Sequence, residues 1–108
     1  MDAENNELNF YDFYNEIEIM LPKKWERVDL SIICPTNTTV KYKFTVVTDK
    51  ELDSSELPQY VDGITQKDVD EIILELVRYV LKYVYGNWSK CDISMTWSGG
   101  FNMKLLYS

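Results

Sequence analysis

Two stretches near the C-terminus alternate apolar and polar residues on either side of a glycine-containing turn, and this pattern restricts the fold more than any other feature. Ser98-Gly99-Gly100 supplies the turn. The apolar positions are Cys91, Ile93, Met95 and Trp97 before it and Phe101, Met103, Leu105 and Tyr107 after it. Alternation with a period of two is typical of half-buried strands, so the sequence predicts a β-hairpin with one face on the core.

An earlier hairpin is expected over about 25–46. Val28, Leu30 and Ile32 alternate with polar residues, and the turn chemistry of Pro35-Thr36-Asn37-Thr38 follows. The next stretch repeats the alternation, with apolar positions at Val40, Tyr42, Phe44 and Val46. β-Branched and aromatic residues with this period favour strands, so the two stretches should pair with each other.

Two other segments carry apolar residues at helical spacing. The first covers about 7–21 and ends at Pro22; its apolar residues are Phe10, Phe13, Tyr14, Ile17, Met20 and Leu21. The second starts at a capping box of Thr65 and Asp68 and runs to about Tyr85, with Gly86 as its C-cap. It has an apolar side and a polar stripe. The apolar side holds Val69, Ile72, Ile73, Leu76, Val80 and Val84, and the stripe holds Glu71, Glu75, Arg78 and Lys82.

Residues 49–63 have no clear period, and we expect a long acidic loop in which 59–61 could form a short edge strand. The order is therefore helix, β-hairpin, acidic loop, helix, β-hairpin, in a single domain over 1–108. This order predicts an α+β fold, with an antiparallel sheet of four to five strands and two helices on one face. The expected core includes Phe13, Ile17, Leu30, Phe44, Ile73, Leu76, Val80, Ile93, Met95 and Met103.

The charge of the chain is acidic and unevenly distributed, with a net charge of -7. Residues 1–18 hold six acids and no base, and residues 49–75 hold nine acids against Lys50 and Lys67. Nucleic-acid binding needs clustered lysine and arginine, so we expect no direct nucleic-acid ligand and a basic partner instead. An acidic excess that only keeps the protein in solution is the alternative.

The chain contains no histidine, which removes the usual general base and the commonest metal ligand. Cys34 and Cys91 lack the spacing of a zinc site, and we interpret both as small buried hydrophobic residues, not a disulfide. The sequence therefore predicts no enzyme, no metal and no cofactor. It shows no membrane-spanning stretch and no secretory signal, so a cytoplasmic location is expected.

The acids of the first helix and of the loop are the predicted partner-binding surface. Asp12 and Glu16 lie four residues apart without a nearby lysine, a like-charge pair that costs stability in an isolated helix. A concentrated negative field speeds association with a basic partner. The predicted partner-binding residues are Asp12, Glu16, Asp49, Glu51, Asp53, Glu56, Tyr60 and Asp62.

Segments along most of the chain resemble the YezG-like immunity protein family, antitoxins that neutralise nuclease toxins of bacterial polymorphic toxin systems. They are the helix at 10–20 with Leu21-Pro22-Lys23-Lys24-Trp25-Glu26-Arg27-Val28, the Tyr42 strand, Glu56-Leu57-Pro58, the helix at 69–85, Trp88, and the Ser98-Gly99-Gly100-Phe101 hairpin closing at Tyr107. The resemblance implies an α+β antitoxin without catalytic residues. Such a protein binds the C-terminal toxin domain and blocks its active site or substrate groove.

The acidic start, the short loop and the aromatic helix end at 83–86 depart from this family and leave the class of toxin open. A small regulatory or small-molecule-binding domain that uses the aromatic face of the sheet is the alternative, and a carboxylate-dependent hydrolase is a weaker one. A deep pocket lined by Phe44, Trp97 and Tyr107 would favour the small-molecule function, whereas a filled core would favour the immunity protein. The sequence leaves open whether the chain is a monomer or a small homo-oligomer.

Overall fold

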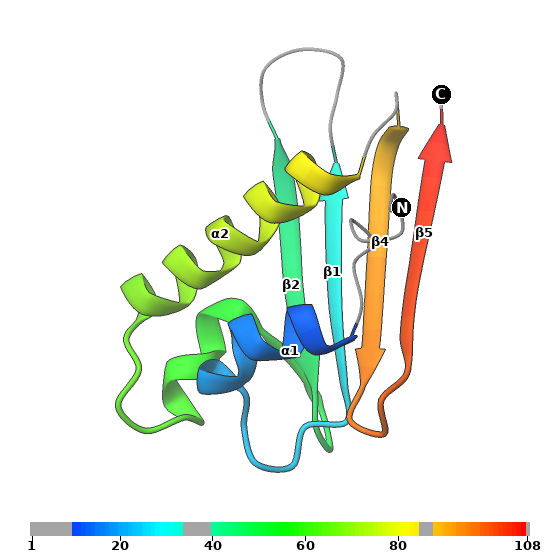
Figure 1. Ribbon diagram of the computed structural model, residues 1–108. Helices are drawn as coiled ribbons and strands as arrows, with labels where there is room; N and C mark the ends of the chain where they lie inside the picture. Colours follow the sequence, from blue (N-terminus) through cyan, green and yellow to red (C-terminus); the bar gives the residue numbers. More distant parts are fainter. Residues whose placement is uncertain (1–9, 34–39, 85–87, 108) are drawn as a thin grey trace.

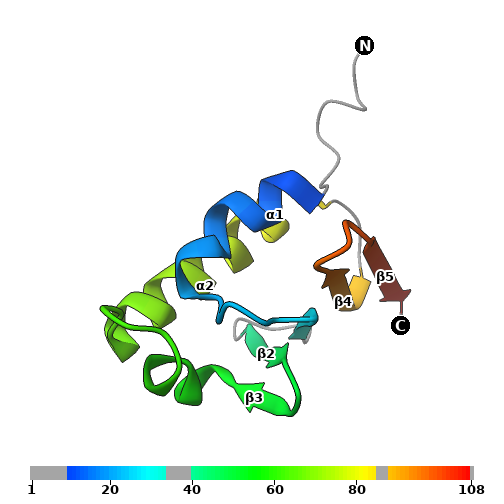
Figure 2. The same ribbon diagram turned by 90° about the horizontal axis from the view of Figure 1, so that it is seen from below.

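Two helices cover one face of a five-stranded antiparallel sheet in the computed structural model, which describes residues 10–33, 40–84 and 88–107 (Figures 1 and 2). The elements are α1 (Phe10–Ile17), η2 (Glu18–Met20), β1 (Arg27–Ile33), β2 (Lys41–Val47), β3 (Glu51–Asp53), η3 (Ser54–Gln59), α2 (Gln66–Tyr83), β4 (Trp88–Thr96) and β5 (Phe101–Tyr107). The predicted α+β class, the antiparallel sheet and the helices on one face are confirmed.

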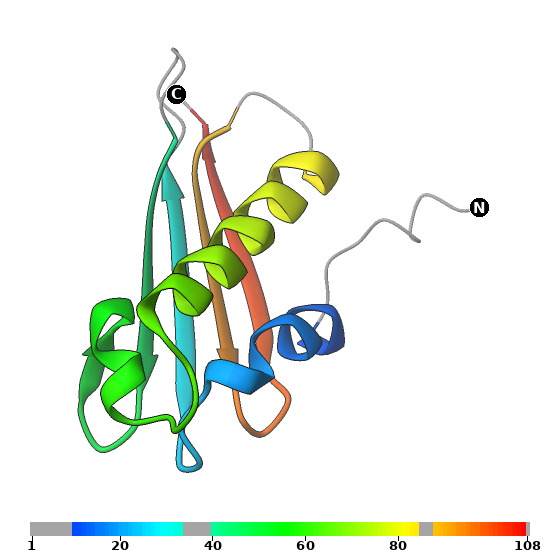
Figure 3. The same ribbon diagram turned by 90° about the vertical axis from the view of Figure 1, so that its left-hand side faces the viewer.

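The strand order in the sheet is β3-β2-β1-β4-β5, so each predicted hairpin forms and the two hairpins meet at β1 and β4. Leu30 in the central strand lies opposite Phe44 of β2 and Ile93 of β4. Because side chains alternate between the two faces of a sheet, this register places all three on the same face. The helices lie over that face, the helix face (Figure 3), and the core residues are buried between the helices and the sheet.

The core follows the predicted periodicity. Nine of the ten expected core residues are buried, and Met103 of β5 is only partly buried. The helices lie over β2, β1 and the near side of β4, and β5 lies beyond them (Figures 1 and 2). An edge strand outside the helix layer therefore buries its apolar side chains less completely.

The start of α2 confirms the predicted capping box. Asp68 N donates to Thr65 Oγ1 at 3.1 Å, and Thr65 N donates to Asp68 Oδ2 at 3.1 Å. The helix ends at Tyr83, before the expected Tyr85, and the expected cap Gly86 lies outside the described residues. No helix in the described part of the chain is both long and apolar enough to cross a membrane.

The acidic segment after β2 is not the long loop that the sequence predicts. Leu52 in β3 and Leu57 in η3 have no exposed surface, and the expected strand at 59–61 is wrong because η3 continues to Gln59. The edge strand instead occupies Glu51–Asp53. A capping box joins the two elements, since Ser55 N donates to Asp53 Oδ2 at 3.2 Å and Asp53 N donates to Glu56 Oε1 at 2.8 Å. β3 and η3 are too short to show a periodic pattern of apolar residues, so the sequence pattern did not reveal them.

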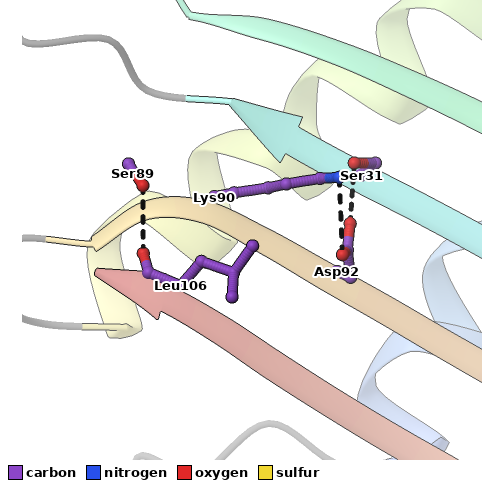
Figure 4. A network of polar contacts seen from close by, with 5 residues as sticks. All are labelled: Ser31, Ser89, Lys90, Asp92 and Leu106. Carbon is purple, nitrogen blue, oxygen red and sulfur yellow. Dashed lines mark hydrogen bonds and ion pairs between the residues drawn. The ribbon is translucent and has the colours of Figure 1, made fainter. Parts of the chain in front are cut away.

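The face opposite the helices, the open face, is mostly polar, although it also exposes Ile33 and Leu106. Ser31 Oγ of β1 donates to Asp92 Oδ1 of β4 at 2.7 Å, and Lys90 Nζ lies 3.7 Å from Asp92 Oδ2 (Figure 4). The Ser31–Asp92 hydrogen bond ties the two hairpins together across the centre of the sheet, while Lys90 pairs with Asp92 along β4 itself. Cys91 points to the other side and is buried, as predicted; Cys34 lies outside the described residues, and the prediction that the two form no disulfide stays a prediction.

Candidate partner-binding site

Acidic residues of α1 and α2 face each other across a groove between the two helices. One hollow of about 350 Å³ is lined by Asp12, Asn15, Glu16, Glu75 and Tyr79. A second, of about 360 Å³, is lined by Glu16, Ile19, Gly63, Ile64, Asp68, Glu71, Ile72 and Glu75. The two hollows share Glu16 and Glu75 and therefore adjoin each other, and we call the two together the acidic groove.

Helical spacing on both walls produces the groove. Asp12 and Glu16 are four residues apart on α1, and Glu71 and Glu75 are four residues apart on α2, so each pair lies on one side of its helix. The apolar sides of both helices bury Phe13, Ile17, Ile73 and Leu76 against the sheet. The helices pack beside each other over the same face, which brings the two acidic rows together (Figure 3).

The residues that line the described groove include five carboxylates and no lysine or arginine: Asp12, Glu16, Asp68, Glu71 and Glu75. The phenol of Tyr79 reports this environment. Its pKa is raised above the usual value, and burial is the largest cause. The negative charge of Asp12 comes next, followed by Tyr83, a hydrogen bond to Asp12 and the charge of Glu16. The groove thus stabilises protons and positive charge.

The floor of the groove near its second hollow is apolar. Ile19 is 69% exposed, Ile72 is partly buried and Ile64 is almost fully buried. A large exposed isoleucine at the edge of a row of carboxylates suits the side chains of lysine and arginine, because their aliphatic stems cover apolar surface while their charged ends remain among polar groups. The groove therefore offers a lysine or arginine side chain both an apolar surface for its stem and carboxylates for its charged end.

The structure does not bring the eight predicted partner-binding residues together on one surface. Asp12 and Glu16 lie in the acidic groove of the helix layer. Glu51 and Asp53 lie opposite Val47 and Thr45, on the open face of the sheet, because Leu52 between them points into the core. The helices and the open face are on opposite sides of the sheet, so these acids do not form the single surface that the sequence suggests.

Several of the remaining predicted residues, which lie in or beside β3 and η3, already have local contacts. Asp53 and Glu56 cap η3, and Asp49 Oδ1 accepts a hydrogen bond from Thr48 Oγ1 at 3.0 Å. Tyr60 is exposed and lies under Lys50, whose Nζ is 5.1 Å from the ring centroid. Asp62 is exposed beyond the end of η3. The part of these residues in partner binding stays a prediction.

Sequence reasoning missed the second wall of the groove. Glu71 and Glu75 were expected to belong to a solvent-exposed stripe with Arg78 and Lys82. The available signal was that both helices carry two acids four residues apart. That spacing alone does not show that the two rows face each other, because the rotation of one helix against the other depends on tertiary packing.

The pocket that would favour a small-molecule function does not form. Phe44 is buried in the core, while Trp97 and Tyr107 were expected to point inward and are 69% and 63% exposed. Trp97 follows the end of β4 and Tyr107 ends β5, so the length of a strand, roughly 20 Å, separates them. They therefore lie at opposite ends of the β4–β5 hairpin and line no common pocket.

Within residues 10–33, 40–84 and 88–107, no three carboxylate or cysteine groups converge as a set of metal ligands. The carboxylates of the groove line its two sides and leave it open to solvent. Their arrangement suits contact with an extended positively charged surface.

No protein-family model matches this chain, and no match was found among curated proteins.

Proposed function

We propose that this chain is an immunity protein that binds and blocks a basic toxin domain, with the C-terminal nuclease domain of a bacterial polymorphic toxin as its target. The observation that carries the proposal is the acidic groove, in which Asp12 and Glu16 of α1 face Glu71 and Glu75 of α2 beside the exposed Ile19. A nuclease domain is basic where it holds nucleic acid, because phosphate binding requires lysine and arginine.

An acidic groove can neutralise such a domain in two ways. Before contact, its negative field attracts the basic surface and raises the association rate, an advantage for an inhibitor that must reach the toxin before the toxin reaches nucleic acid. After contact, carboxylates paired with the phosphate-binding lysines and arginines occupy the substrate groove. Neither step needs catalysis or a cofactor, and both would take place in the cytoplasm of the cell that makes the toxin.

The resemblance of several chain segments to the YezG-like immunity proteins supports the same function. The net charge of -7 supports it independently, because fifteen of the eighteen acids lie in residues 1–18 and 49–75, the ranges that contain the five carboxylates of the acidic groove. The absence of histidine is consistent with inhibition by binding.

Growth rescue tests the proposal. The C-terminal domain of a candidate polymorphic toxin, chosen from the reading frames next to the one for this chain, would be expressed from an inducible promoter, with and without this chain. We expect growth arrest by the domain alone and recovery when the chain is present. Recovery should be lost when Glu16 and Glu75 are both changed to lysine, whereas Asp70→Lys with Lys67→Glu, which leaves the net charge unchanged, should still rescue. Arrest that persists with the wild-type chain would contradict the proposed function.

A further inference from the structure

The strand β5 forms one edge of the sheet, and no described strand pairs with its outer side (Figure 1). It has seven residues, contains no proline, and has Lys104 as its single charged residue. The opposite edge differs, because β3 has three residues, two of them acidic, and leads directly into η3. A long edge strand without proline is a template for pairing with another chain, whereas a short charged one is protected.

Hydrogen bonds at both ends of the β4–β5 ladder show which backbone groups of β5 face outward. Thr96 N donates to Gly100 O at 3.0 Å, and Ser89 Oγ donates to Leu106 O at 3.2 Å (Figure 4). Even-numbered residues of the strand therefore direct their backbone groups toward β4. Because the direction alternates along a strand, the N–H and C=O groups of Phe101, Met103 and Leu105 point to the free edge.

The same three residues carry apolar side chains on the helix face, and all three are only partly buried. Phe13 of α1 reaches Phe101, with ring centroids 5.3 Å apart, but β5 itself lies beyond both helices (Figure 2). Unpaired backbone groups and incompletely covered apolar side chains thus occur together along one edge. A strand added beside β5 would form hydrogen bonds with the unpaired backbone groups and would cover the apolar side chains.

We infer that β5 pairs with β5 of a second copy of this chain, antiparallel and around a two-fold axis at Met103. In this register Met103 lies opposite Met103 of the second copy, and Phe101 lies opposite Leu105. Each of these residues has its backbone groups directed outward, so each exchanges both hydrogen bonds with its opposite residue. On the open face, Asn102 lies opposite Lys104. The edge is therefore complementary to itself.

Charge selects this register and this partner. An axis at Lys104 would place two lysines directly opposite each other, which destabilises a pair of strands. The axis at Met103 avoids this contact, and β5 brings no acid to the interface. The acids of β3 lie at the other edge of the sheet, so pairing at β5 keeps them at the two outer ends of the dimer. Pairing at β5 uses none of the residues of the acidic groove.

Sedimentation velocity on the full chain tests the pairing, with Met103→Pro as the blocking variant. Proline at this position removes an N–H that points to the free edge and leaves the ladder with β4 intact. We expect a reversible monomer–dimer equilibrium for the wild type and a monomer with an unchanged circular dichroism spectrum for Met103→Pro. A wild type that stays monomeric up to about 1 mM would overturn the inference. This holds whether the backbone amides at the edge of β5 are exposed to solvent or covered by another segment of the same chain. A folded Met103→Pro dimer would overturn it as well.

Two substitutions at Asn102 test the register without depending on the proline variant. Because Asn102 lies opposite Lys104 twice in the dimer, Asn102→Lys should raise the dimer Kd roughly 2- to 30-fold and Asn102→Glu should lower it by a similar factor. With the axis at Lys104, residue 102 would instead lie opposite Leu106, and the two substitutions would not act in opposite directions. That result would overturn the proposed register.

Cross-linking provides a geometric check in a Cys34→Ser background. The Met103→Cys thiols would lie opposite each other with Cα atoms about 5.5 Å apart, within the range that a disulfide spans. Lys104→Cys is the matched control, since its thiols would not lie opposite each other. We expect an oxidised dimer from Met103→Cys and little from Lys104→Cys. Cross-linking in the reverse order, or by neither variant, would contradict an axis at Met103.

Discussion

Tyr79 of α2 lies against Asp12 of α1, and this contact joins the two walls of the acidic groove. The two residues are far apart in sequence and come from helices that pack on the same face of the sheet. Burial and the neighbouring carboxylates together raise the pKa of the phenol. Tyr79 is therefore a probe of the negative field in the groove.

The first prediction is that Asp12→Asn lowers the pKa of Tyr79, because it removes both the charge of Asp12 and the hydrogen bond to a carboxylate. Burial, the largest cause, remains, so the pKa should fall but stay above that of an unfolded chain. Carbon-13 NMR of labelled tyrosine, assigned with Tyr79→Phe, would measure the pKa. Glu16→Gln is the matched control and should lower it less, since Glu16 is the weakest of the causes. An equal or larger effect of Glu16→Gln would show that Asp12 does not contact the phenol.

The raised pKa of Tyr79 also predicts how stability depends on alkaline pH. The folded state holds this proton more tightly than the unfolded state, so the contribution is fully present below the unfolded value near 10.0. It is lost as the pH rises through the higher folded pKa. The free energy of unfolding should therefore fall less steeply in Tyr79→Phe than in the wild type above about pH 10. The free energy of unfolding would be measured by urea unfolding at each pH. If it fell equally steeply with pH in both proteins, this linkage would be contradicted.

Asp53 gives the opposite pH dependence. Hydrogen bonds from the Ser55 side chain and backbone lower the pKa of Asp53 below its usual value of 3.8. Its contribution is present above 3.8 and is lost as the pH falls through the lower folded pKa. At neutral pH, Asp53→Ala should destabilise the protein by about 0.5 to 1 kcal/mol because it removes an N-cap.

Asp53→Asn is the matched control for this prediction, because asparagine caps a helix about as well as aspartate but does not ionise in this range. The difference in unfolding free energy between wild type and Asp53→Asn should shrink as the pH falls to about 2. A constant difference across the titration, measured by urea unfolding at each pH, would show that the capping hydrogen bonds do not depend on the charge.

The packing of the core predicts that Leu76→Ala strongly lowers the stability of the protein. Leu76 is almost completely buried on the side of α2 that faces the sheet, so truncation leaves a cavity and should cost about 2 to 5 kcal/mol. Leu74→Ala is the matched control on the same helix, since Leu74 is substantially exposed, and should cost much less. Denaturant midpoints for the two variants would settle the comparison, and similar midpoints would contradict the described orientation of α2.

Local signals in the sequence account for most of the fold. The two hairpins follow from alternation and turn residues, and the start of α2 follows from the spacing of Thr65 and Asp68. β3 and η3 could not be found in the same way, because each buries a single leucine and offers no repeat. The pairing of Asp53 with Glu56 was the one local signal for η3.

The candidate site was only half predictable. The like-charge pair of Asp12 and Glu16 pointed to α1, but nothing in the sequence placed it against Glu71 and Glu75. That placement depends on how α1 and α2 rotate when they pack on the sheet. The sequence also grouped Glu51 with the acids of α1, although the register of β3 puts it on the open face.

Association kinetics with a toxin domain that this chain neutralises in the growth-rescue experiment test the central claim most directly. The wild type would be compared with two variants that change the net charge by the same amount, Glu16→Lys with Glu75→Lys in the acidic groove and Asp49→Lys with Glu51→Lys at β3. If the acidic groove binds the domain, stopped-flow mixing at low ionic strength should show association at least roughly tenfold slower for the groove variant, and a smaller decrease for the β3 variant. Association of the groove variant at the wild-type rate, or a larger decrease for the β3 variant, would contradict binding in the groove.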